Sequence, residues 1–523
     1  MLLAWLATEL LRRASWAARE HSRGPAAARE HSSQARGPAA AHEHGRAPSR
    51  GLGMRRLSDA AEIAASYLEQ LVQGSCPSWD VSYTLPSSRI CAHPMVQTVV
   101  LYAQMHRLPP SRPDATAQPL SISGLGLAGG GAGARVAVDA RRETLRCPDG
   151  GTVAIDWLTL ESDGMEQQAN PGAPVVIAFP GVGECKTHSG FVPMLLGALL
   201  EAGNADGCTP IVGAVVYPGF NRVPLDSHKL PGTAYLTTDD AGVILRHARE
   251  KHPTSPLIVM GCSFGSALAV GWAGRNPAEA KRLRIGSILL YAYGHSVGST
   301  VCTTDTAMAG LTGRIVSSKW RRAILDESHA TGRANVASLR ELEKVRPGFS
   351  VEKLRNARTI EEWDLACLPA YGLPTLSSML VSADPIYTFE QLQSVCPVVL
   401  FNADDDWLCP SGRIEANRET FYARLSNVVI VSTRGGGHLG WVDEIEGTYG
   451  LAATNGRVKP KWRPRVMGEH SQWLVTVTEQ LVQATATGKL QGSVTGAMHV
   501  KSVLACVSGL SHECDHCVVS DAL

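Results

Sequence analysis

From about residue 142 onward, short apolar segments rich in β-branched residues alternate with longer segments whose apolar positions have helical spacing. The short segments have the length and composition of buried strands, and they lie at 152–159, 174–179, 211–217, 256–262, 284–292, 397–402 and 427–432. Helical patterns lie between several of them, at 191–202, 237–251 and 264–275. Strands that alternate with helices predict an α/β fold, in which helices cover both faces of a mostly parallel sheet.

One interval between predicted strands is far longer than a simple connection. Residues 293–395 carry a mostly charged helical pattern, over 317–345 and 350–366, with proline and glycine breaks. An insertion of this length in a compact α/β domain predicts a helical cap, at 296–395, over the functional site. Three apolar clusters within it either line a site beneath the cap or pack the cap's own core, and they lie at 365–368, 371–373 and 376–380.

The two ends of the chain differ in composition from this central part. Residues 1–57 are rich in arginine and alanine and contain the segment Arg-Gly-Pro-Ala-Ala-Ala twice, which predicts a disordered extension. The first residues of this segment contain leucines at helical spacing. A targeting segment or a membrane-surface helix is therefore the alternative to disorder. Residues 58–139 combine a predicted helix with a Gly/Pro-rich linker, 140–485 form the main domain, and 486–523 form a tail.

Composition and charge exclude several classes of protein. The 523 residues include 49 basic and 48 acidic side chains, a net charge of +1, so no overall field recruits nucleic acid. There is no run of 18 apolar residues, as a spanning helix would need. The 13 cysteines are sparse and irregularly spaced, which favours a reducing compartment over a disulfide scaffold. We therefore expect an intracellular globular protein, with organelle targeting or peripheral membrane contact left open.

A glycine-rich stretch in the linker formally matches a dinucleotide-binding turn. Gly124, Gly126 and Gly129 have the required spacing, but more glycines follow instead of a helix. No acidic residue lies near the position that would bind the ribose. We interpret the stretch as a flexible linker and predict no cofactor.

The sharpest local signal is Gly261-Cys-Ser-Phe-Gly265, which follows a predicted strand directly and precedes a helix of small residues. A nucleophilic serine needs such a tight turn, because side chains two positions away on either side would collide with neighbouring backbone. The N-terminus of the following helix also favours developing negative charge. We therefore predict Ser263 as a catalytic nucleophile.

A serine is a weak nucleophile and needs a base that a third group orients. In this architecture the acid follows a later strand and the histidine follows the last one. The strand at 397–402 ends in three adjacent aspartates, of which we predict Asp406 as the acid and keep Asp405 as an alternative. A solvated acidic turn or a cation site is the other interpretation of these carboxylates. His438 follows the strand at 427–432 behind a run of glycines, and we predict it as the base.

The strand at 174–179 leads into a glycine-rich loop that begins Pro180-Gly-Val-Gly183. Two backbone N–H groups would bind the oxyanion of a tetrahedral intermediate. We predict that they belong to Phe264, next to the nucleophile, and to Val182 in this loop. An ordinary tight turn is the alternative for the loop.

These motifs now carry a family resemblance, in which five segments occur in order: Asp149–Trp157, Pro180–Gly183, Gly261–Gly265, Asn402–Asp406 and Gly436–Gly440. Together they resemble the α/β-hydrolase subfamily that includes bacterial YheT, the yeast ethanol acyltransferase/esterases and animal phospholipase-type hydrolase-domain proteins. The likeness spans roughly 140–480, and Arg358–Asp364 also resembles that family's cap. The resemblance implies an eight-stranded α/β-hydrolase fold. It also implies hydrolysis or alcohol acyl transfer on medium- or long-chain acyl esters of lipids.

Two alternatives stay open at this point. The hydrolase fold could be catalytically silent and serve in binding or as a scaffold. In the tail, His512, Cys514 and Cys517 lie near Cys506, but a single Cys-x-x-Cys is a poor signal for zinc, so we predict no metal. The sequence does not decide between hydrolysis and acyl transfer, nor does it fix the acyl length, the head group or the oligomeric state.

Overall fold

A computed structural model describes the central part of the chain. The described residues are 138–160, 172–181, 191–205, 209–220, 222–225, 239–293, 307–376, 378, 391–392, 395–406, 427–433, 435–439, 441, 450–454, 457–461 and 472–490. The predicted extension at 1–57, nearly all of the linker region 58–139 and the tail beyond residue 490 lie outside these residues. The glycine-rich stretch and the Cys/His cluster lie outside them too. Predictions about those segments, and the predicted domain boundaries, stay predictions.

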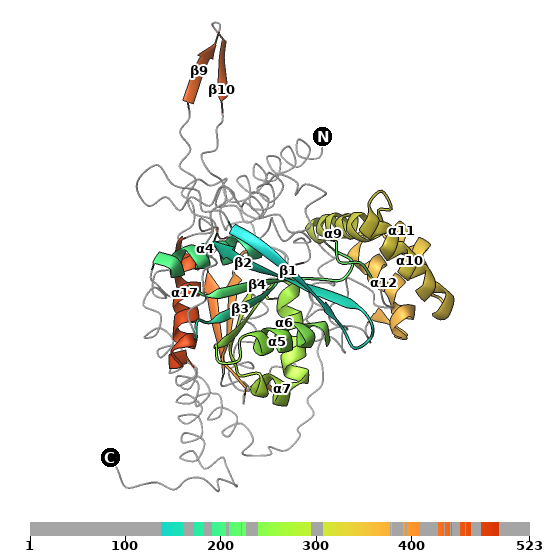
Figure 1. Cartoon of the computed structure of the whole chain (residues 1–523). Helices are drawn as coiled ribbons and strands as arrows, with labels where there is room; N and C mark the ends of the chain where they lie inside the picture. Colours follow the sequence, from blue (N-terminus) through green and yellow to red (C-terminus); the bar gives the residue numbers. More distant parts are fainter. Residues whose placement is uncertain are drawn as a thin grey trace, which may run out of the picture. The chain divides into compact units, whose positions relative to one another are not determined.

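The core of the fold is an eight-stranded sheet in the order β1-β2-β4-β3-β5-β6-β7-β8. Strand β2 runs antiparallel to its neighbours β1 and β4, and all the other pairs are parallel (Figure 1). The strands are β1 (Val138–Arg146), β2 (Thr152–Leu160), β3 (Val175–Phe179), β4 (Ile211–Val216), β5 (Leu257–Cys262), β6 (Ile285–Tyr291), β7 (Val398–Ala403) and β8 (Val428–Thr433). The predicted mostly parallel sheet of the α/β fold is thereby confirmed. A separate two-stranded sheet pairs β9 (Gly450–Thr454) with β10 (Arg457–Lys461).

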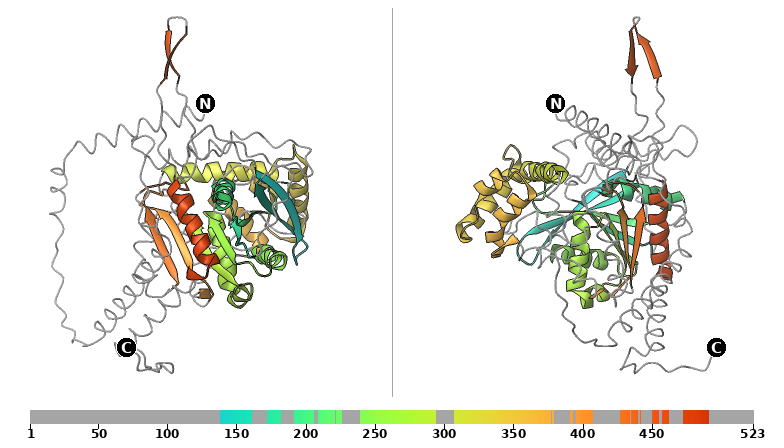
Figure 2. Two further views of the ribbon diagram at one scale, coloured as in Figure 1. Left: turned by 60° about the vertical axis from the view of Figure 1, so that its left-hand side comes forward. Right: turned by 180° about the vertical axis from the view of Figure 1, so that it is seen from behind.

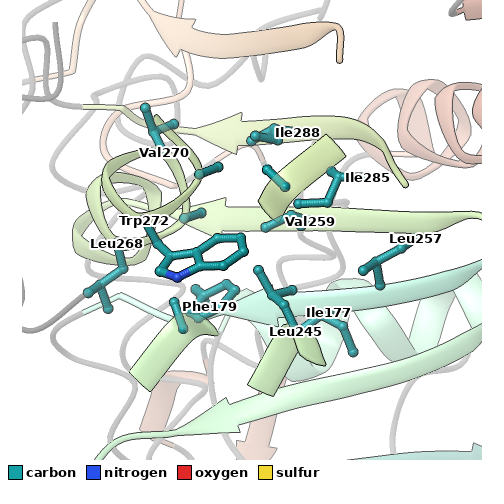
Figure 3. Packing of buried hydrophobic residues seen from close by; sticks show 14 of the residues in the cluster. Ile177, Phe179, Leu245, Leu257, Val259, Leu268, Val270, Trp272, Ile285 and Ile288 are labelled. Atoms are coloured by element: carbon teal, nitrogen blue, oxygen red, sulfur yellow. The ribbon is translucent and has the colours of Figure 1, made fainter. Parts of the chain in front are cut away.

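Helices cover both faces of the large sheet. Successive strand residues point to opposite faces, and since the parallel strands are largely apolar, both faces are buried under helices. On β3, Val176 and Ala178 pack into a cluster with α4 (Phe191–Ala205) and α17 (Gln472–Ala486). Val175, Ile177 and Phe179 pack into the opposite cluster, whose helices are α5 (Asp239–Lys251), α6 (Phe264–Arg275) and α7 (Pro277–Arg282) (Figures 2 and 3). No helix among the described residues is long and apolar enough to cross a bilayer.

The edge strand β1 is polar, so hydrophobic periodicity gave no sign of it. Arg142 on β1 donates two hydrogen bonds of 2.7 Å to Asp156 on β2, whose carboxylate is buried. The neighbouring Glu143 accepts hydrogen bonds from Trp157 and Lys251 and contacts His247. Burial opposes ionisation of Glu143, but these partners outweigh it and lower its pKa to about 2. Paired charges therefore attach β1 to the sheet where other strands use apolar side chains.

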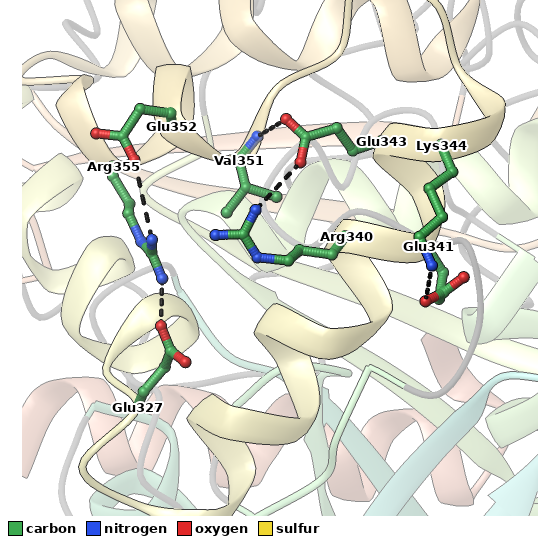
Figure 4. Close-up of polar contacts among 8 residues, drawn as sticks. All are labelled: Glu327, Arg340, Glu341, Glu343, Lys344, Val351, Glu352 and Arg355. Atoms are coloured by element: carbon green, nitrogen blue, oxygen red, sulfur yellow. Dashed lines mark hydrogen bonds and ion pairs between the residues drawn. The ribbon is translucent and has the colours of Figure 1, made fainter.

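In the part of the chain between β6 and β7 that the structure describes lie four helices, at the place where the sequence predicts a cap, and these four helices are called the cap below. They are α9 (Ala307–Leu325), α10 (Ala330–Val345), α11 (Val351–Asn356) and α12 (Ile360–Tyr371). The helical pattern at 317–345 is two helices, because the turn after α9 ends with His329, which caps α10 by accepting from the Gly332 N–H at 2.9 Å. On the exposed side, Arg355 pairs with Glu327 and Glu352, and other ion pairs lie along α10 (Figure 4). Exposed pairs contribute little to stability, so the apolar core of the cap holds it together.

The sequence predicts that the apolar cluster at 365–368 either lines a site beneath the cap or packs the cap's own core. The structure decides between these two interpretations. Ala366 and Cys367 are buried in the cap's own core, beside Trp320 and Trp363. Leu365 is 47% exposed, which is the opposite of what a residue lining an enclosed site would show. The middle of the 365–368 cluster therefore packs the cap itself. The 376–380 cluster lies largely outside the described residues.

One carboxyl group is buried in the cap with no basic partner among the described residues to favour its charged form. Asp364 on α12 is 4% exposed, and in the part of the chain that the structure describes its Oδ1 has no hydrogen-bond partner. Burial, with repulsion from Glu361, raises the pKa of Asp364 to about 8. The side chain is therefore largely protonated at neutral pH, since burial disfavours the charged form of a carboxyl.

This carboxyl makes the stability of the protein depend on pH. The unfolded carboxyl loses its proton near pH 4, whereas the folded one keeps it up to a pH of about 8. Between these values the folded state binds more protons, so the free energy of unfolding falls as the pH rises. We expect Asp364→Asn to raise the Tm relative to the parent by several degrees more at pH 8 than at pH 5. Parallel Tm curves for the two proteins, measured by calorimetry, would contradict this.

Candidate active site

Ser263 lies on a strained turn between β5 and α6. Its φ of 52° and ψ of −116° lie in a region that side-chain-bearing residues rarely adopt. The two flanking glycines explain why the turn can close. A Cβ on Gly261 would lie 2.5 Å from the Ser266 Cα, and one on Gly265 would lie 2.0 Å from the Phe179 carbonyl oxygen. The Gly-x-Ser-x-Gly spacing is thus a steric requirement of this turn.

The structure brings Ser263 together with His438 and Asp406, which are far apart in the sequence. His438 Nε2 lies 2.8 Å from Ser263 Oγ. His438 Nδ1 lies 3.0 Å and 3.2 Å from the two carboxylate oxygens of Asp406. The side chain of Asp406 is fully buried, and that of His438 is nearly so. The three predicted residues therefore form one continuous series of hydrogen bonds.

The loops after β7 and β8 deliver these two side chains. Asp406 follows β7 and lies at the carboxyl ends of the parallel strands, as Ser263 does after β5. The loop after β8 bends sharply before His438, since Gly436 has a φ of 135°. A Cβ on Gly436 would also lie 2.5 Å from the indole nitrogen of Trp441. Only glycine fits there, which accounts for the glycine run in front of the histidine.

Asp405, the alternative acid, has a different partner. Its Oδ1 accepts a hydrogen bond of 2.8 Å from the Gly437 backbone N–H. Burial raises the pKa of Asp405, and the bond from Gly437 opposes that shift. Asp405 therefore fixes the glycine loop, while Asp406 faces the imidazole.

The hydrogen-bond series defines what the imidazole can do. A carboxylate only accepts hydrogen bonds, so His438 Nδ1 must be the donor to Asp406. With the proton on Nδ1, Nε2 carries the lone pair that faces Ser263 Oγ. An imidazole oriented in this way can take the serine proton as the hydroxyl attacks an electrophile. Within the described residues no group of His, Cys, Asp and Glu side chains is arranged to hold a metal ion.

Of the two residues predicted to donate to the oxyanion, the structure describes one. Phe264 is the first residue of α6, directly after Ser263, whereas Val182 lies outside the described residues. The loop that would carry Val182 begins close to the nucleophile, because a Cβ on Gly181 would lie 3.4 Å from the Ser263 Cβ. The Phe264 ring makes edge contacts with the rings of Tyr217 and Trp320. Neither Tyr217 nor Trp320 lies in a recognisable motif, and the one signal in the sequence is that Tyr217 ends a predicted strand.

Comparison with known proteins gives distant relatives. No family model matches the chain. Phospholipase ABHD3 of Mus musculus is 22% identical over 318 residues, which cover 59% of this chain and 68% of that protein. Embryogenesis-associated protein EMB8 of Picea glauca is 21% identical over 337 residues, 61% of this chain and 65% of that one. A solved esterase structure from Rhizomucor miehei has a TM-score of 0.34 and 14% identity, covering 71% of this chain and 85% of that one.

The fold, the turn that carries Ser263, and the order of the three site residues along the chain are all typical of α/β-hydrolases. The sheet is parallel except for β2, and the serine turn joins a central strand to its helix. The serine, aspartate and histidine follow one another in the chain in the order that α/β-hydrolases use. The resemblance stated from the sequence motifs is confirmed at this level. The chain has the α/β-hydrolase fold and is similar in sequence to phospholipase ABHD3 and to EMB8.

Proposed function

We propose that this protein is a serine hydrolase of acyl esters. The observation that carries the proposal is the buried series of hydrogen bonds from Asp406 through His438 to Ser263. A fold that has lost catalysis has no need to keep a serine on a strained turn. The same series is the reason to favour catalysis over a silent binding or scaffold protein.

In the proposed reaction, Ser263 Oγ attacks the ester carbonyl carbon while its proton passes to His438 Nε2. Asp406 holds the resulting imidazolium through Nδ1. The carbonyl oxygen becomes an oxyanion, and the backbone N–H groups of Phe264 and Val182 bind it. As the C–O bond of the ester breaks, the leaving alkoxide takes the proton from Nε2, and an acyl-enzyme remains.

The acyl-enzyme is then resolved by a second nucleophile that His438 deprotonates. Water gives hydrolysis and an alcohol gives acyl transfer, by the same steps with the same residues. We propose acyl esters of medium- or long-chain lipids as the substrate class. The name of the ABHD3 relative, a phospholipase, supports this class. A peripheral contact with a membrane surface would suit such substrates.

A panel of substrates tests the proposal. The purified full chain is assayed with p-nitrophenyl esters from acetyl to palmitoyl and with phosphatidylcholine vesicles. The Ser263→Ala variant gives the background. We expect Ser263-dependent release of product, with kcat/KM that rises with acyl length, because each buried methylene contributes about 0.8 kcal/mol. Turnover of acetyl esters alone would contradict the lipid substrate, and no Ser263-dependent turnover in the panel would contradict the hydrolase.

A further inference from the structure

Tyr217 lies at the carboxyl end of β4, next to the two loops that form the site. In the sheet, β3 lies between β4 and β5. Tyr217, Pro180 and Ser263 directly follow these three neighbouring strands. Three adjacent strands therefore deliver an aromatic residue, the start of the glycine-rich loop and the nucleophile to the same edge of the sheet.

The side chain of Tyr217 contacts both backbone segments that flank the nucleophile. Its hydroxyl donates a hydrogen bond of 2.9 Å to the Pro180 carbonyl oxygen. Its ring meets the Phe264 ring edge-on, with 6.1 Å between centroids and 82° between planes. Pro180 precedes Gly181, whose backbone lies against Ser263, and Phe264 follows Ser263 directly. One side chain thus bridges the two sides of the turn.

Packing around the turn leaves little freedom for Pro180 to move alone. A Cβ on Gly265 would lie 2.0 Å from the Phe179 carbonyl oxygen and 2.7 Å from the Pro180 carbonyl oxygen. The end of β3 therefore lies directly on the first turn of α6. A shift of the Pro180 carbonyl changes the distance between the glycine-rich loop and the first N–H groups of that helix.

The cap holds the chain that follows Tyr217. Asn335 on α10 donates a hydrogen bond of 2.9 Å to the Gly219 carbonyl oxygen and accepts one of 2.8 Å from the Leu225 N–H. Asn335 is fully buried. On the other side of Phe264, Trp320 of α9 contacts its ring at 6.4 Å between centroids. Tyr217 itself packs against the core of the cap, so both Tyr217 and the Phe264 ring are in contact with the cap.

From these contacts we infer that Tyr217 is a positioning residue for the oxyanion site of the proposed hydrolase. Its hydroxyl fixes the Pro180–Gly181 backbone against Ser263, and its ring fixes Phe264 on the other side. The inference rests on the proposed function. Positioning of this kind stabilises the transition state and leaves ground-state binding of the ester unchanged, so its loss lowers kcat and not KM.

The test is Tyr217→Phe, which removes the hydroxyl and keeps the ring. We expect kcat for an ester substrate to fall about tenfold with KM unchanged, because a Pro180–Gly181 backbone that is no longer held in place stabilises the transition state less well. The rate at which a fluorophosphonate labels Ser263 should fall as well, because the phosphoryl oxygen of the probe develops negative charge in the same oxyanion site as Ser263 displaces fluoride. The matched control is Tyr291→Phe, which removes a buried hydroxyl that bonds Thr478 Oγ1 at 2.8 Å.

Both variants are assayed at a temperature at which circular dichroism shows them folded. The control should lose thermal stability and keep kcat within about twofold of the parent. A Tyr217→Phe protein with parental kcat and labelling rate, whatever its Tm, would overturn the positioning role, and so would a rise in KM alone. If the parent itself is not labelled at Ser263, the proposed function fails and takes this inference with it. If the parent is labelled at Ser263 and Tyr217→Phe keeps the parental kcat and labelling rate, the inference about Tyr217 is wrong and the proposed function stands.

Discussion

Replacing Ser263 with alanine should lower kcat for ester substrates by a factor on the order of 10⁶, because members of a triad act as a unit. Ser263 Oγ is the atom that His438 Nε2 contacts at 2.8 Å. The substitution removes a single oxygen from the turn. The glycines that permit the turn are unchanged, so we expect the fold and the Tm to be retained.

A serine in the same segment provides the matched control. Ser266 is fully buried on α6, and its Oγ donates to a backbone carbonyl. Ser266→Ala should therefore keep most of the activity while it removes the same chemical group. Steady-state kinetics of the three proteins decides the matter. A folded Ser263→Ala protein that turns over esters within about tenfold of the parent would rule out Ser263 as the nucleophile.

The second large effect separates three adjacent aspartates. Asp406→Asn should lower kcat by roughly 10⁴, because an amide in place of the carboxylate no longer holds the imidazole in the required tautomer. Asp405→Asn should cost little, since an amide oxygen can still accept the hydrogen bond that Gly437 donates. Asp404 is exposed, so Asp404→Asn serves as the baseline.

Each of the three variants replaces one aspartate with asparagine, and all three positions lie in one short loop. The measured quantity is kcat for one ester at pH 7.5, with the Tm of each variant as a check on folding. If Asp405→Asn loses most of its kcat and Asp406→Asn keeps a nearly normal kcat, Asp405 is the acid of the triad. Three equally active variants would remove the carboxylate from the mechanism altogether.

Much of the sheet can be read from the sequence, because buried parallel strands are apolar throughout. The segments predicted at 174–179 and 211–217 correspond to β3 (Val175–Phe179) and β4 (Ile211–Val216), and the other predicted strands agree equally well. Strand β1 is the exception, since its charged residues Arg142 and Glu143 find their partners only in the folded sheet. A hydrophobic pattern cannot anticipate a strand that is held by ion pairs.

The site shows the same division. Order along the chain was enough to single out Ser263, Asp406 and His438, because each follows a strand of the expected kind. The sequence favours Asp406 but leaves Asp405 as an alternative, since both lie on one loop and the path of the backbone decides which carboxylate meets the imidazole. Tyr217 had no motif around it. Its partners, the Pro180 carbonyl oxygen and the Phe264 ring, are distant in sequence and meet it only across neighbouring strands.

The most direct test is covalent labelling of the native full chain with a fluorophosphonate, followed by intact-mass and peptide-level mass spectrometry. A serine that His438 activates should form one adduct per chain, on Ser263, and the adduct should be absent from Ser263→Ala. The Asp406→Asn variant should label far more slowly than the parent, because its imidazole is no longer held in place. A folded parent that takes up no label, or that is labelled on a residue other than Ser263, would contradict the assignment of this chain as a serine hydrolase.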